Sequence, residues 1–535
     1  MSSTDTPKTI LKSSYAFLSG TFLSRLSGLG RDTTMAAVFG SHPAIAAFMV
    51  AFRFANLIRR LFGEGPLPAG FIPHFESVRS SSEQQGAQFF RDLFFSLACF
   101  LTLFIGGIEA ILLSIWHFAH LSEGSSQVLF LTILMLPGVL FICLFGLCGG
   151  LLQCNRRFFI TGFAPVAFNL VWIGAVLMLR HQEPVLATVD LSLAVVLAFL
   201  MQWAIIAPQT FSYMRQTLSW KECLSPRLFS SELVRLVKPF LLGVIGVGAV
   251  QINSAMDAIF ARCASLEGPA YLWYAIRIEQ LPLALFGIAL SSALLPPLAR
   301  AIKEGAYAHY TMLLRFALRR SFSLIFPCSA GLFVLGVTGT NLLYGRGDFD
   351  MQATYQTVLC LWGYGLGLLP AVFVLILAPA FYADREYRIP TKGSLLSVAL
   401  NLCLSALFVF VFHWGAFSIA VATSISAWFN YLYLSVQLSK KLGETSMNKE
   451  VVFSFLKTAT ATVVAVIATL LIGVFFVADP TIALLMGNSE VVFERAFATQ
   501  SLQFVAMGGV FLLTFLSYAW MLNAEDVLCW LHPPK

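Results

Sequence analysis

The chain has 535 residues, of which 58% are hydrophobic and only 11% are charged. Soluble domains contain about 25% charged residues, so this composition excludes an ordinary water-soluble globular protein and indicates a membrane protein. The net charge of +7 could suggest nucleic acid, but the positive residues flank apolar segments, and no nucleic-acid partner is expected. The ten cysteines show no CxxC or Cys/His spacing, so neither disulfides nor a metal site is expected.

The apolar segments are long enough to cross a bilayer, which takes about 20 residues. The first two, 13–40 and 44–72, contain charged residues, and the third, 93–119, is interrupted only by Glu109. Stretches without Asp, Glu, Lys or Arg follow at 127–153, 158–179, 191–214, 239–256, 280–299, 321–345, 351–383, 393–439, 458–478 and 496–524. The stretch 393–439 is twice the required length, and we expect a break near His413–Gly415. The predicted fold is an all-α polytopic membrane protein with about 14 transmembrane helices.

Basic residues predict the orientation. The first 17 residues lack the apolar core and cleavage site of a removable signal peptide, so the first helix is expected to stay. With the N-terminus inside, the predicted inner loops contain 24 of the 34 Lys and Arg residues, and the outer loops contain only Arg180, Arg262, Arg346 and Arg495. This asymmetry follows the positive-inside rule and predicts that both termini are cytoplasmic.

An internal repeat is visible at an offset of 224 residues. Segments 51–73 and 275–297 share eight identities in 23 positions, including the pair Phe62-Gly63 with Phe286-Gly287. Chance similarity between two Leu-rich helices is the alternative. Parallel duplication of a six-helix unit is a common transporter plan, with the substrate site between the halves. We therefore expect two parallel six-helix repeats around a central cavity, an N-lobe at 1–220 and a C-lobe at 221–445, with helices 13 and 14 at 446–535.

Six cations remain outside the predicted loops, and all are arginines: Arg25, Arg31, Arg53, Arg59, Arg60 and Arg277. A cation at bilayer depth costs at least about 2.5–3.5 kcal/mol, so it normally faces a wet cavity or a partner. Guanidinium groups bind phosphate oxygens bidentately and stay charged. Only Asp32, Glu64 and Glu279 lie nearby, and this cationic surplus suits a pyrophosphate. The alternative is that some arginines reach the interface or brace helices through Asp32 and Glu64.

An acid also lies inside an apolar span. Asp257 belongs to the polar patch 251–257 of predicted helix 7 and is a candidate for a cation site or a proton relay. Asn401 and Thr423 could add neutral oxygen ligands, although hydrogen bonding between helices explains them equally well. The GYGLG segment at 363–367 lies inside a predicted helix without the βαβ setting of a nucleotide site, so we interpret it as helix packing.

Several motifs resemble the MurJ/MviN family, which are lipid II flippases of the multidrug/oligosaccharidyl-lipid/polysaccharide exporter superfamily. The motifs are SRLSGLGRD (24–32), FRFANLIRRLFGEGPLPAGFIPHF (52–75), GLLQCNRRF (150–158), FAPVAFN (163–169), YAIRIEQLP (274–282) and LAPAFYADREYRIPTK (377–392). They occur along residues 10–440 in the family's order. Helices 13 and 14 agree with the family in number rather than in motif.

The resemblance implies a cationic cavity for the headgroup and a groove along helices 13 and 14 for the undecaprenyl tail. The family's essential arginines fall on Arg25, Arg31, Arg59 and Arg277, and its motifs include Asp32, Asn56 and Glu64. Some members bind Na⁺ through an acid on helix 7, which here is Asp257. Two positions depart from the family, since Ala46 and Ile276 replace residues that are commonly acidic.

The expected function is therefore to flip lipid II, an undecaprenyl-pyrophosphate-linked peptidoglycan precursor, across the bacterial cytoplasmic membrane by alternating access. The expectation includes no cofactor, coupling to Na⁺, H⁺ or the membrane potential, membrane lipids as partners and a functional monomer. One alternative is an exporter of polysaccharide-lipid intermediates or a drug/cation antiporter, and the antiporter should display unpaired acids in its N-terminal lobe. Another is a membrane enzyme acting on lipid-linked sugars, which usually needs clustered acids, histidines or a metal.

Overall fold

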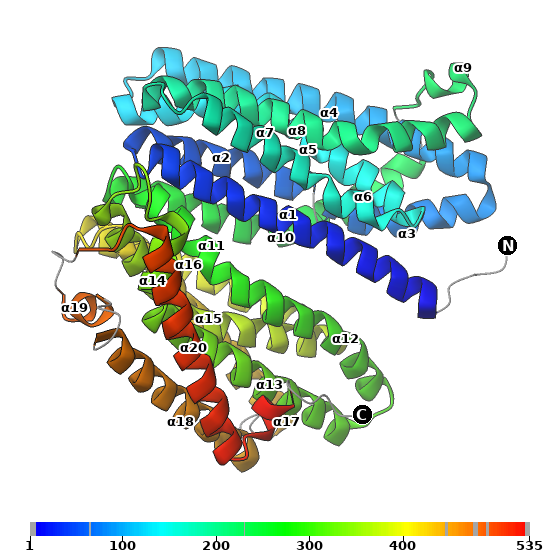
Figure 1. Cartoon of the computed structure of the whole chain (residues 1–535). Helices are drawn as coiled ribbons and strands as arrows, with labels where there is room; N and C mark the ends of the chain where they lie inside the picture. Colours follow the sequence, from blue (N-terminus) through cyan, green and yellow to red (C-terminus); the bar gives the residue numbers. More distant parts are fainter. Residues whose placement is uncertain are drawn as a thin grey trace. The chain divides into compact units, whose positions relative to one another are not determined.

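The computed structural model describes residues 7–63, 66–228, 231–443, 448–474, 480–487 and 492–529. Throughout these ranges every regular element is a helix (Figure 1). The chain forms two compact units, Met1–Ala258 and Ile259–Lys535. The lobe boundaries expected from the sequence stay predictions.

The first unit contains α1 (Pro7–Phe39), α2 (Pro43–Phe62), α3 (Pro66–Ser81), α4 (Glu83–Phe118), α5 (Glu123–Cys154), α6 (Phe158–Phe163), α7 (Pro165–Met178), α8 (Pro184–Thr217), α9 (Trp220–Cys223) and most of α10 (Ser231–Ala264). Helix α5 packs against α2, α4 and α8, and α7 packs against α1 and α8. The apolar core of this unit therefore lies around α5 and α8.

The second unit contains α11 (Gly268–Pro282), the π-helix η1 (Leu283–Gly287), α12 (Ile288–Lys303), α13 (Tyr307–Val334), α14 (Gly336–Tyr344), α15 (Met351–Ala383), α16 (Arg388–Phe410), α17 (Phe417–Leu442), α18 (Lys449–Ile472), α19 (Thr481–Leu485), α20 (Phe497–Met521) and α21 (Glu525–Leu528). Helix α15 packs against α11, α12, α13 and α17. It occupies the centre of this unit.

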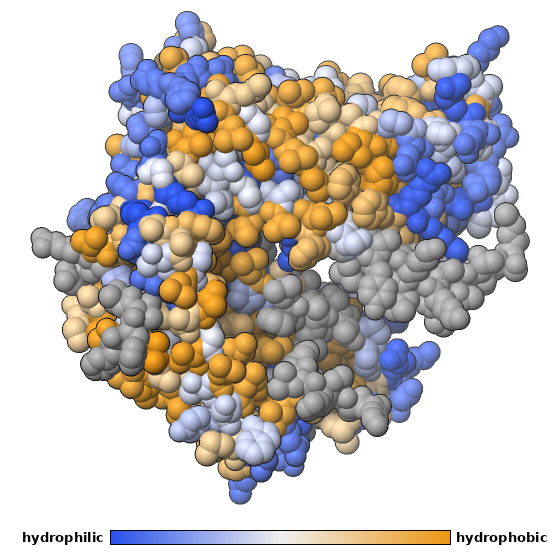
Figure 2. Space-filling model, in the orientation of Figure 1, coloured by the Kyte–Doolittle hydropathy of each residue, from blue (hydrophilic) through white to orange (hydrophobic). Residues whose placement is uncertain are grey.

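The helices confirm an all-α multi-pass membrane protein. Among the described residues, nine helices are long and apolar enough to cross a membrane, or ten if α13 and α14, which meet at a 69° bend, form one span. The remaining predicted spans coincide with α1, α2–α3, α10 and α11–α12, which contain charges or interruptions. The total of fourteen is consistent with this arrangement and stays a prediction. Apolar residues cover much of the helix surface in Figure 2, as expected for helices in lipid.

The predicted break in the stretch 393–439 is confirmed. Helix α16 ends at Phe410 and α17 begins at Phe417. Between them His413 and Gly415 adopt φ angles of 52° and 74°. A left-handed backbone interrupts the helical hydrogen-bond ladder, so one apolar stretch forms two antiparallel helices.

Helix boundaries support the repeat. Helix α4 begins at Glu83 and α13 at Tyr307, so this pair of helices keeps the offset of 224. The α helix is also interrupted at the aligned Phe-Gly pair in both copies, because α2 ends at Phe62 and the π-helix η1 ends at Gly287.

The two aligned glycines face equivalent helices. A Cβ at Gly63 would lie 2.9 Å from Cys143 Cα on α5, and one at Gly287 would lie 3.0 Å from Val372 Cγ2 on α15. A Cβ at Gly146 would collide with the carbonyl oxygen of Gly63. Glycine is needed at positions 63 and 146 because the backbone at the end of α2 and that of α5 approach too closely for a side chain, whereas at Gly287 the added atom would meet only side chains.

The GYGLG segment packs helices together, as interpreted from the sequence. A Cβ at Gly363 would lie 2.8 Å from Ala420 Cβ, and one at Gly367 would lie 2.9 Å from Ser424 Cα. The Ser424 hydroxyl donates to the Gly363 carbonyl at 2.6 Å. These contacts join α15 to α17 and confirm the packing interpretation.

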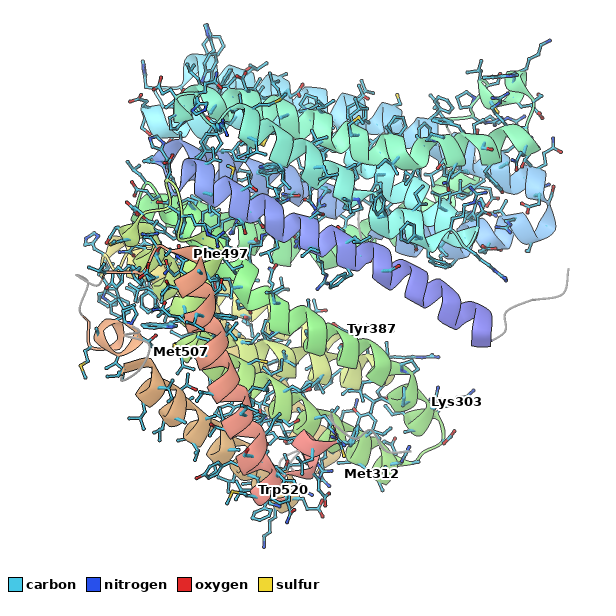
Figure 3. All side chains as sticks on the ribbon, viewed as in Figure 1. Lys303, Met312, Tyr387, Phe497, Met507 and Trp520 are labelled. Carbon is cyan, nitrogen blue, oxygen red and sulfur yellow. The ribbon has the colours of Figure 1, made fainter. Side chains whose placement is uncertain are left out.

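Helices α18 and α20 pack against each other, and α18 packs on α13. On α20, Met507 is fully buried while Trp520 is 70% exposed, so this helix has a protein face and an outer face (Figure 3). Beyond α20 the Asp526 carboxylate accepts from Ser454 Oγ at 2.6 Å, and the Asp526 carbonyl accepts from Arg320 Nη1 at 2.9 Å. These bonds tie the end of the chain to α18 and α13.

Candidate functional site

The most buried of the predicted arginines is Arg31, in α1, which is 8% exposed. Its Nε and Nη2 both donate to Asp32 Oδ1, at 3.0 and 2.8 Å. Its Nη1 donates to Asn169 Oδ1 on α7 at 3.2 Å. Because a buried cation needs compensation, the adjacent carboxylate stabilises the charge and the amide fixes its direction.

Asn169 links this group to the rest of α1. Its Nδ2 donates to the Ser24 carbonyl at 3.1 Å and to Ser27 Oγ at 2.9 Å. The Arg31 guanidinium carbon lies 4.8 Å from the centre of the Trp172 ring, also on α7. The network therefore braces α1 against α7, which is the role that the sequence left open as the alternative for Asp32.

Arg25 lies on the same helix in a different environment. It is exposed, and it is six residues, or about 9 Å along the helix axis, from the buried Arg31. A Cβ at the intervening Gly28 would be 3.6 Å from Asn169 Nδ2. Helix α1 therefore carries one buried and one accessible guanidinium.

The arginines of α2 lie towards its C-terminal half. Arg53 is half-buried, and its Nη1 donates to the Ser254 carbonyl of α10 at 3.2 Å. The exposed Arg60 donates through Nη1 to Gln251 Oε1 at 3.2 Å. Arg59 is half-buried in the last turn of α2, where the negative end of the helix dipole favours a cation. The Asn56 amide donates to the Phe52 carbonyl of its own helix at 3.0 Å.

The polar patch of α10 thus contacts α2 through Gln251 and Ser254. Farther along, Asp257 is 7% exposed, and Asn253 Nδ2 lies 3.5 Å from its Oδ2. The predicted partner Glu64 lies outside the described residues. Within the first unit, the structure brings α1 to α7 and α2 to α10 through side chains that the sequence singled out.

In the second unit, Arg277 is half-buried on α11, with its guanidinium carbon 4.4 Å from the Trp273 ring centre. Asn401 on α16 is 1% exposed, and Thr423 Oγ1 donates to the Ile419 carbonyl within α17 at 3.0 Å. A hydrogen bond of 2.8 Å from Ser397 to the Ser426 carbonyl sets the antiparallel register of these helices. One turn further along, that register brings Asn401 level with Thr423.

The predicted clamp of Arg25, Arg31, Arg59 and Arg277 combines residues of both units, and so does the cation site of Asp257, Asn401 and Thr423. Because the residues of each grouping are divided between the two units, both groupings stay predictions. Across the described ranges no group of three or more His, Cys, Asp or Glu side chains could hold a metal ion.

Asn169 is the functional candidate that the sequence reasoning missed. It is an amide within the otherwise apolar span 158–179. A lone amide at membrane depth usually hydrogen-bonds across helices, and this signal could have identified it. Its partner lies 138 residues earlier in the chain, which no local pattern indicates.

Helices that are long and apolar enough to cross a membrane occur in both units, which defines a multi-pass membrane protein. A family model described as "Lipid II flippase MurJ" matches residues 35–486. The chain therefore belongs to the lipid II flippase MurJ family and is a transporter rather than an enzyme.

Two relatives named as flippases cover most of the chain. A probable lipid II flippase MurJ of Chlamydia pneumoniae is 30% identical over 531 residues, covering 99% of this chain and 95% of the relative. The lipid II flippase MurJ of Burkholderia cenocepacia is 28% identical over 438 residues, covering 79% of this chain and 82% of the relative.

Solved structures support the fold. A lipid II flippase MurJ in an inward closed conformation matches with a TM-score of 0.73 at 20% identity, over 95% of this chain and 99% of that one. An inward-facing multidrug resistance MATE family transporter of the MOP superfamily matches with a TM-score of 0.62 at 15% identity, over 81% of this chain and 99% of that one.

Proposed function

We propose that this chain flips lipid II from the inner to the outer leaflet of the bacterial cytoplasmic membrane by alternating access. Family membership supports this function, and so do the names of the curated relatives. The observation that carries the proposal is the set of guanidinium groups on α1 and α2, with Arg25 exposed and Arg59 half-buried at a helix end. A pyrophosphate is the substrate group that such donors bind best.

Arg31 has a different role in this proposal. Its three nitrogens already donate to Asp32 and Asn169. We assign it to positioning α1 against α7, so that Arg25 meets the headgroup at a defined height. Arg25, Arg59 and Arg277 are the phosphate ligands. Arg31 would join them only by exchanging one of its present acceptors for a phosphate oxygen.

The remaining parts follow from the sequence. Both termini lie in the cytoplasm, as the distribution of basic loops favours. The undecaprenyl tail lies along α18 and α20, and a single protomer carries out transport. No cofactor takes part. A Na⁺ or H⁺ gradient acting through Asp257, or the membrane potential, resets the transporter.

Charge reversal at Arg59 tests the function. In cells depleted of their own flippase, the chain should restore lipid II that is accessible to a headgroup-cleaving enzyme added outside. Arg59→Glu should lower this accessible fraction to the depleted background, because a carboxylate repels pyrophosphate. Arg180→Glu, on an exposed loop residue, should keep full activity at the same membrane level.

Full activity of the Arg59→Glu variant at normal abundance would contradict the phosphate-binding role. Failure of the unaltered chain to expose lipid II, with transport of another lipid-linked oligosaccharide instead, would replace the substrate while keeping the transporter class.

A further inference from the structure

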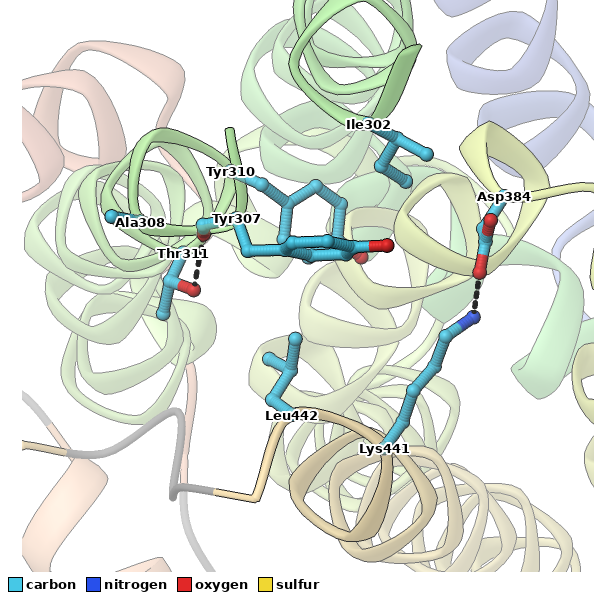
Figure 4. Close-up of a pocket in the computed structure, with 8 residues that line it drawn as sticks. All are labelled: Ile302, Tyr307, Ala308, Tyr310, Thr311, Asp384, Lys441 and Leu442. Atoms are coloured by element: carbon cyan, nitrogen blue, oxygen red, sulfur yellow. Dashed lines mark hydrogen bonds and ion pairs between the residues drawn. The ribbon is translucent and has the colours of Figure 1, made fainter. Parts of the chain in front are cut away.

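The second unit contains a cavity of about 540 Å³ that the proposed transport cycle does not use (Figure 4). It lies where α12 ends and α13 begins, beside the ends of α15 and α17. Its polar lining comes from Tyr307, Tyr310 and Thr311 on α13, Asp384 after α15 and Lys441 on α17. Small-molecule sites typically occupy about 300–1,000 Å³, so this cavity can hold a ligand.

The cavity is surrounded by helix ends and exposed cations. Helices α12, α15 and α17 end beside it, α13 begins there, and exposed Lys303, Arg385 and Lys440 lie on the adjoining segments. Basic residues at the ends of apolar helices are typical of the membrane surface. On α13, Met312 and Phe316 are 55% and 43% exposed, and the Arg320 guanidinium carbon lies 5.1 Å from the Phe316 ring centre. A ligand in the cavity therefore lies next to charged groups and near exposed apolar side chains.

The charges of the lining are balanced. Lys441 Nζ pairs with Asp384 Oδ2, and the two side chains are 30% and 36% exposed, so water and ligands can reach the pair. The buried Tyr310 donates to the Ala380 carbonyl at 2.9 Å, and the Thr311 hydroxyl donates to the Tyr307 carbonyl at 2.8 Å. Tyr307 is 61% exposed. Its hydroxyl and the Thr311 oxygen can both accept from a ligand.

The equivalent corner of the first unit is filled. At the offset of 224, Arg79 corresponds to Lys303 and Glu83 to Tyr307. Arg79 reaches inward, donating to Asn155 Oδ1 at 3.2 Å and lying 3.2 Å from Glu83 Oε1. Tyr213 of α8 donates to Glu83 Oε2 at 3.1 Å.

In the second unit the basic residue of the corresponding polar pair comes from a different helix, α17. Asn155 and Asp384 directly follow α5 and α15, and each is followed by an arginine with a positive φ, 58° at Arg156 and 59° at Arg385. Asp384 pairs with Lys441 of α17, whereas Lys303 of α12 is exposed. The residue aligned with Arg79 is therefore exposed in the second unit and does not form this ion pair.

We propose that this cavity binds the headgroup of a phospholipid that carries both a phosphate and a primary ammonium group, of the phosphatidylethanolamine type. The phosphate contacts Lys441, the ammonium contacts Asp384 with the Tyr307 and Thr311 oxygens as further acceptors, and the acyl chains lie along Met312 and Phe316. A zwitterion can insert into an ion pair and give each partner a new counter-charge. An anionic lipid would leave the Asp384 carboxylate facing a phosphate, which is unfavourable.

The test measures lipid binding to the purified full chain in detergent by native mass spectrometry. The probes are phosphatidylethanolamine, phosphatidylglycerol and phosphatidylcholine with identical acyl chains, together with soluble glycerophosphoethanolamine. We expect phosphatidylethanolamine to bind most tightly, because its ammonium donates hydrogen bonds that trimethylammonium cannot. Equal or tighter binding of phosphatidylglycerol would overturn the proposal. Equal binding of the soluble headgroup would overturn the membrane origin of the ligand.

Two variants and one control locate the site. Ala308→Trp fills the cavity from an exposed lining position, and Lys441→Ala removes the phosphate contact. Each should weaken phosphatidylethanolamine binding by about tenfold or more, the scale of one charge-assisted hydrogen bond. Lys440→Ala removes a neighbouring exposed charge outside the lining and should change binding less than about twofold.

Unchanged binding by both Ala308→Trp and Lys441→Ala, with normal unfolding temperatures, would overturn the site. If Ala308→Trp fails to fold, the comparison of phosphatidylethanolamine binding by Lys441→Ala and Lys440→Ala tests the site by itself. Neither outcome depends on lipid II transport, so failure of this proposal and failure of the transport proposal are distinguishable.

Discussion

Helices α2–α3 and α11–α12 show how the two copies of the repeat have diverged. Both are interrupted at the aligned Phe-Gly pair, and both present glycine to the central helix of their unit. Their chemistry differs, because Arg59 and Arg60 of α2 correspond to Leu283 and Ala284. The interruption is thus a property of the repeated backbone, whereas the Arg59–Arg60 pair belongs to the first copy only.

The first helices of the two copies differ in the same direction. At the offset of 224, the pair Arg31–Asp32 in α1 corresponds to Ala255–Met256 in α10. The first copy holds its helix through a buried polar network, whereas the second copy has Ala255 and Met256 at the corresponding positions.

The largest effect should come from breaking the polar network of α1. Asp32→Ala leaves the Arg31 charge buried without its carboxylate, which typically costs about 3–5 kcal/mol. The half-buried counterpart change, Met256→Ala, should cost about 1–2 kcal/mol, less than truncation of a fully buried Met. Thermal unfolding of the purified protein compares the two. Equal losses would mean that the network adds nothing beyond packing.

A smaller effect should distinguish the two interrupted helices. Gly146→Ala places a methyl group on the Gly63 carbonyl, where only backbone can yield, and should cost about 1–3 kcal/mol. At Gly287 the added methyl meets the Val372 side chain, which can rotate, so Gly287→Ala should cost less than about 1 kcal/mol. Unfolding temperatures of the two variants report the difference. A larger loss at Gly287 would reverse the interpretation of these contacts.

The appended helices, which have no counterpart in the first unit, allow a third test. Asp526→Asn removes the charge that lies 3.6 Å from both Arg319 Nε and Arg320 Nε. The amide can still accept from Ser454, so we expect a loss of about 1 kcal/mol. Limited proteolysis after α20 should become faster, while α1–α8 keep their protection. Glu525→Gln, on the neighbouring residue, is the matched control.

The smallest effect should appear around the short helix α9 of the first unit. In the capping box of α9, the Ser219 backbone N–H and hydroxyl both donate to Glu222, and these bonds lower the pKa of its carboxyl group. A lowered folded-state pKa means that the box stabilises α9 above the ordinary carboxyl pKa and stops doing so as pH falls through the lowered value. Hydrogen exchange of residues 219–228 measures this.

Ser219→Ala should accelerate that exchange at neutral pH, and the difference from the unaltered protein should vanish in acid. Ser225→Ala, on an exposed serine of the same segment, should leave exchange unchanged. A Ser219→Ala effect that is independent of pH would show that the carboxylate has no part in holding α9.

Local patterns explain why much of the fold could be predicted. Apolar stretches of sufficient length predicted the helices, and His413–Gly415 predicted the break between α16 and α17. The arginines stood out because charge is rare in such stretches. Their partners did not, because Arg60 donates to Gln251, which is 191 residues away in the chain.

The cavity beside Asp384 could not be predicted at all. It depends on which of two helices supplies the cation, and Lys303 and Lys441 look alike in sequence. Which lysine forms the ion pair depends on the direction in which each side chain extends once the helices have packed. Periodicity and composition contain no information about them.

The network around Arg31 constrains how relatives of this chain can drift. A relative that has lost only Asp32 keeps a buried cation without its carboxylate beside the aromatic rings of α7. One that has lost only Arg31 keeps a buried carboxylate without its cation. Either single substitution is therefore strongly destabilising. Positions 31, 32 and 169 should accordingly change as a set. Descendants that abandon the guanidinium should also carry apolar residues at the other two positions.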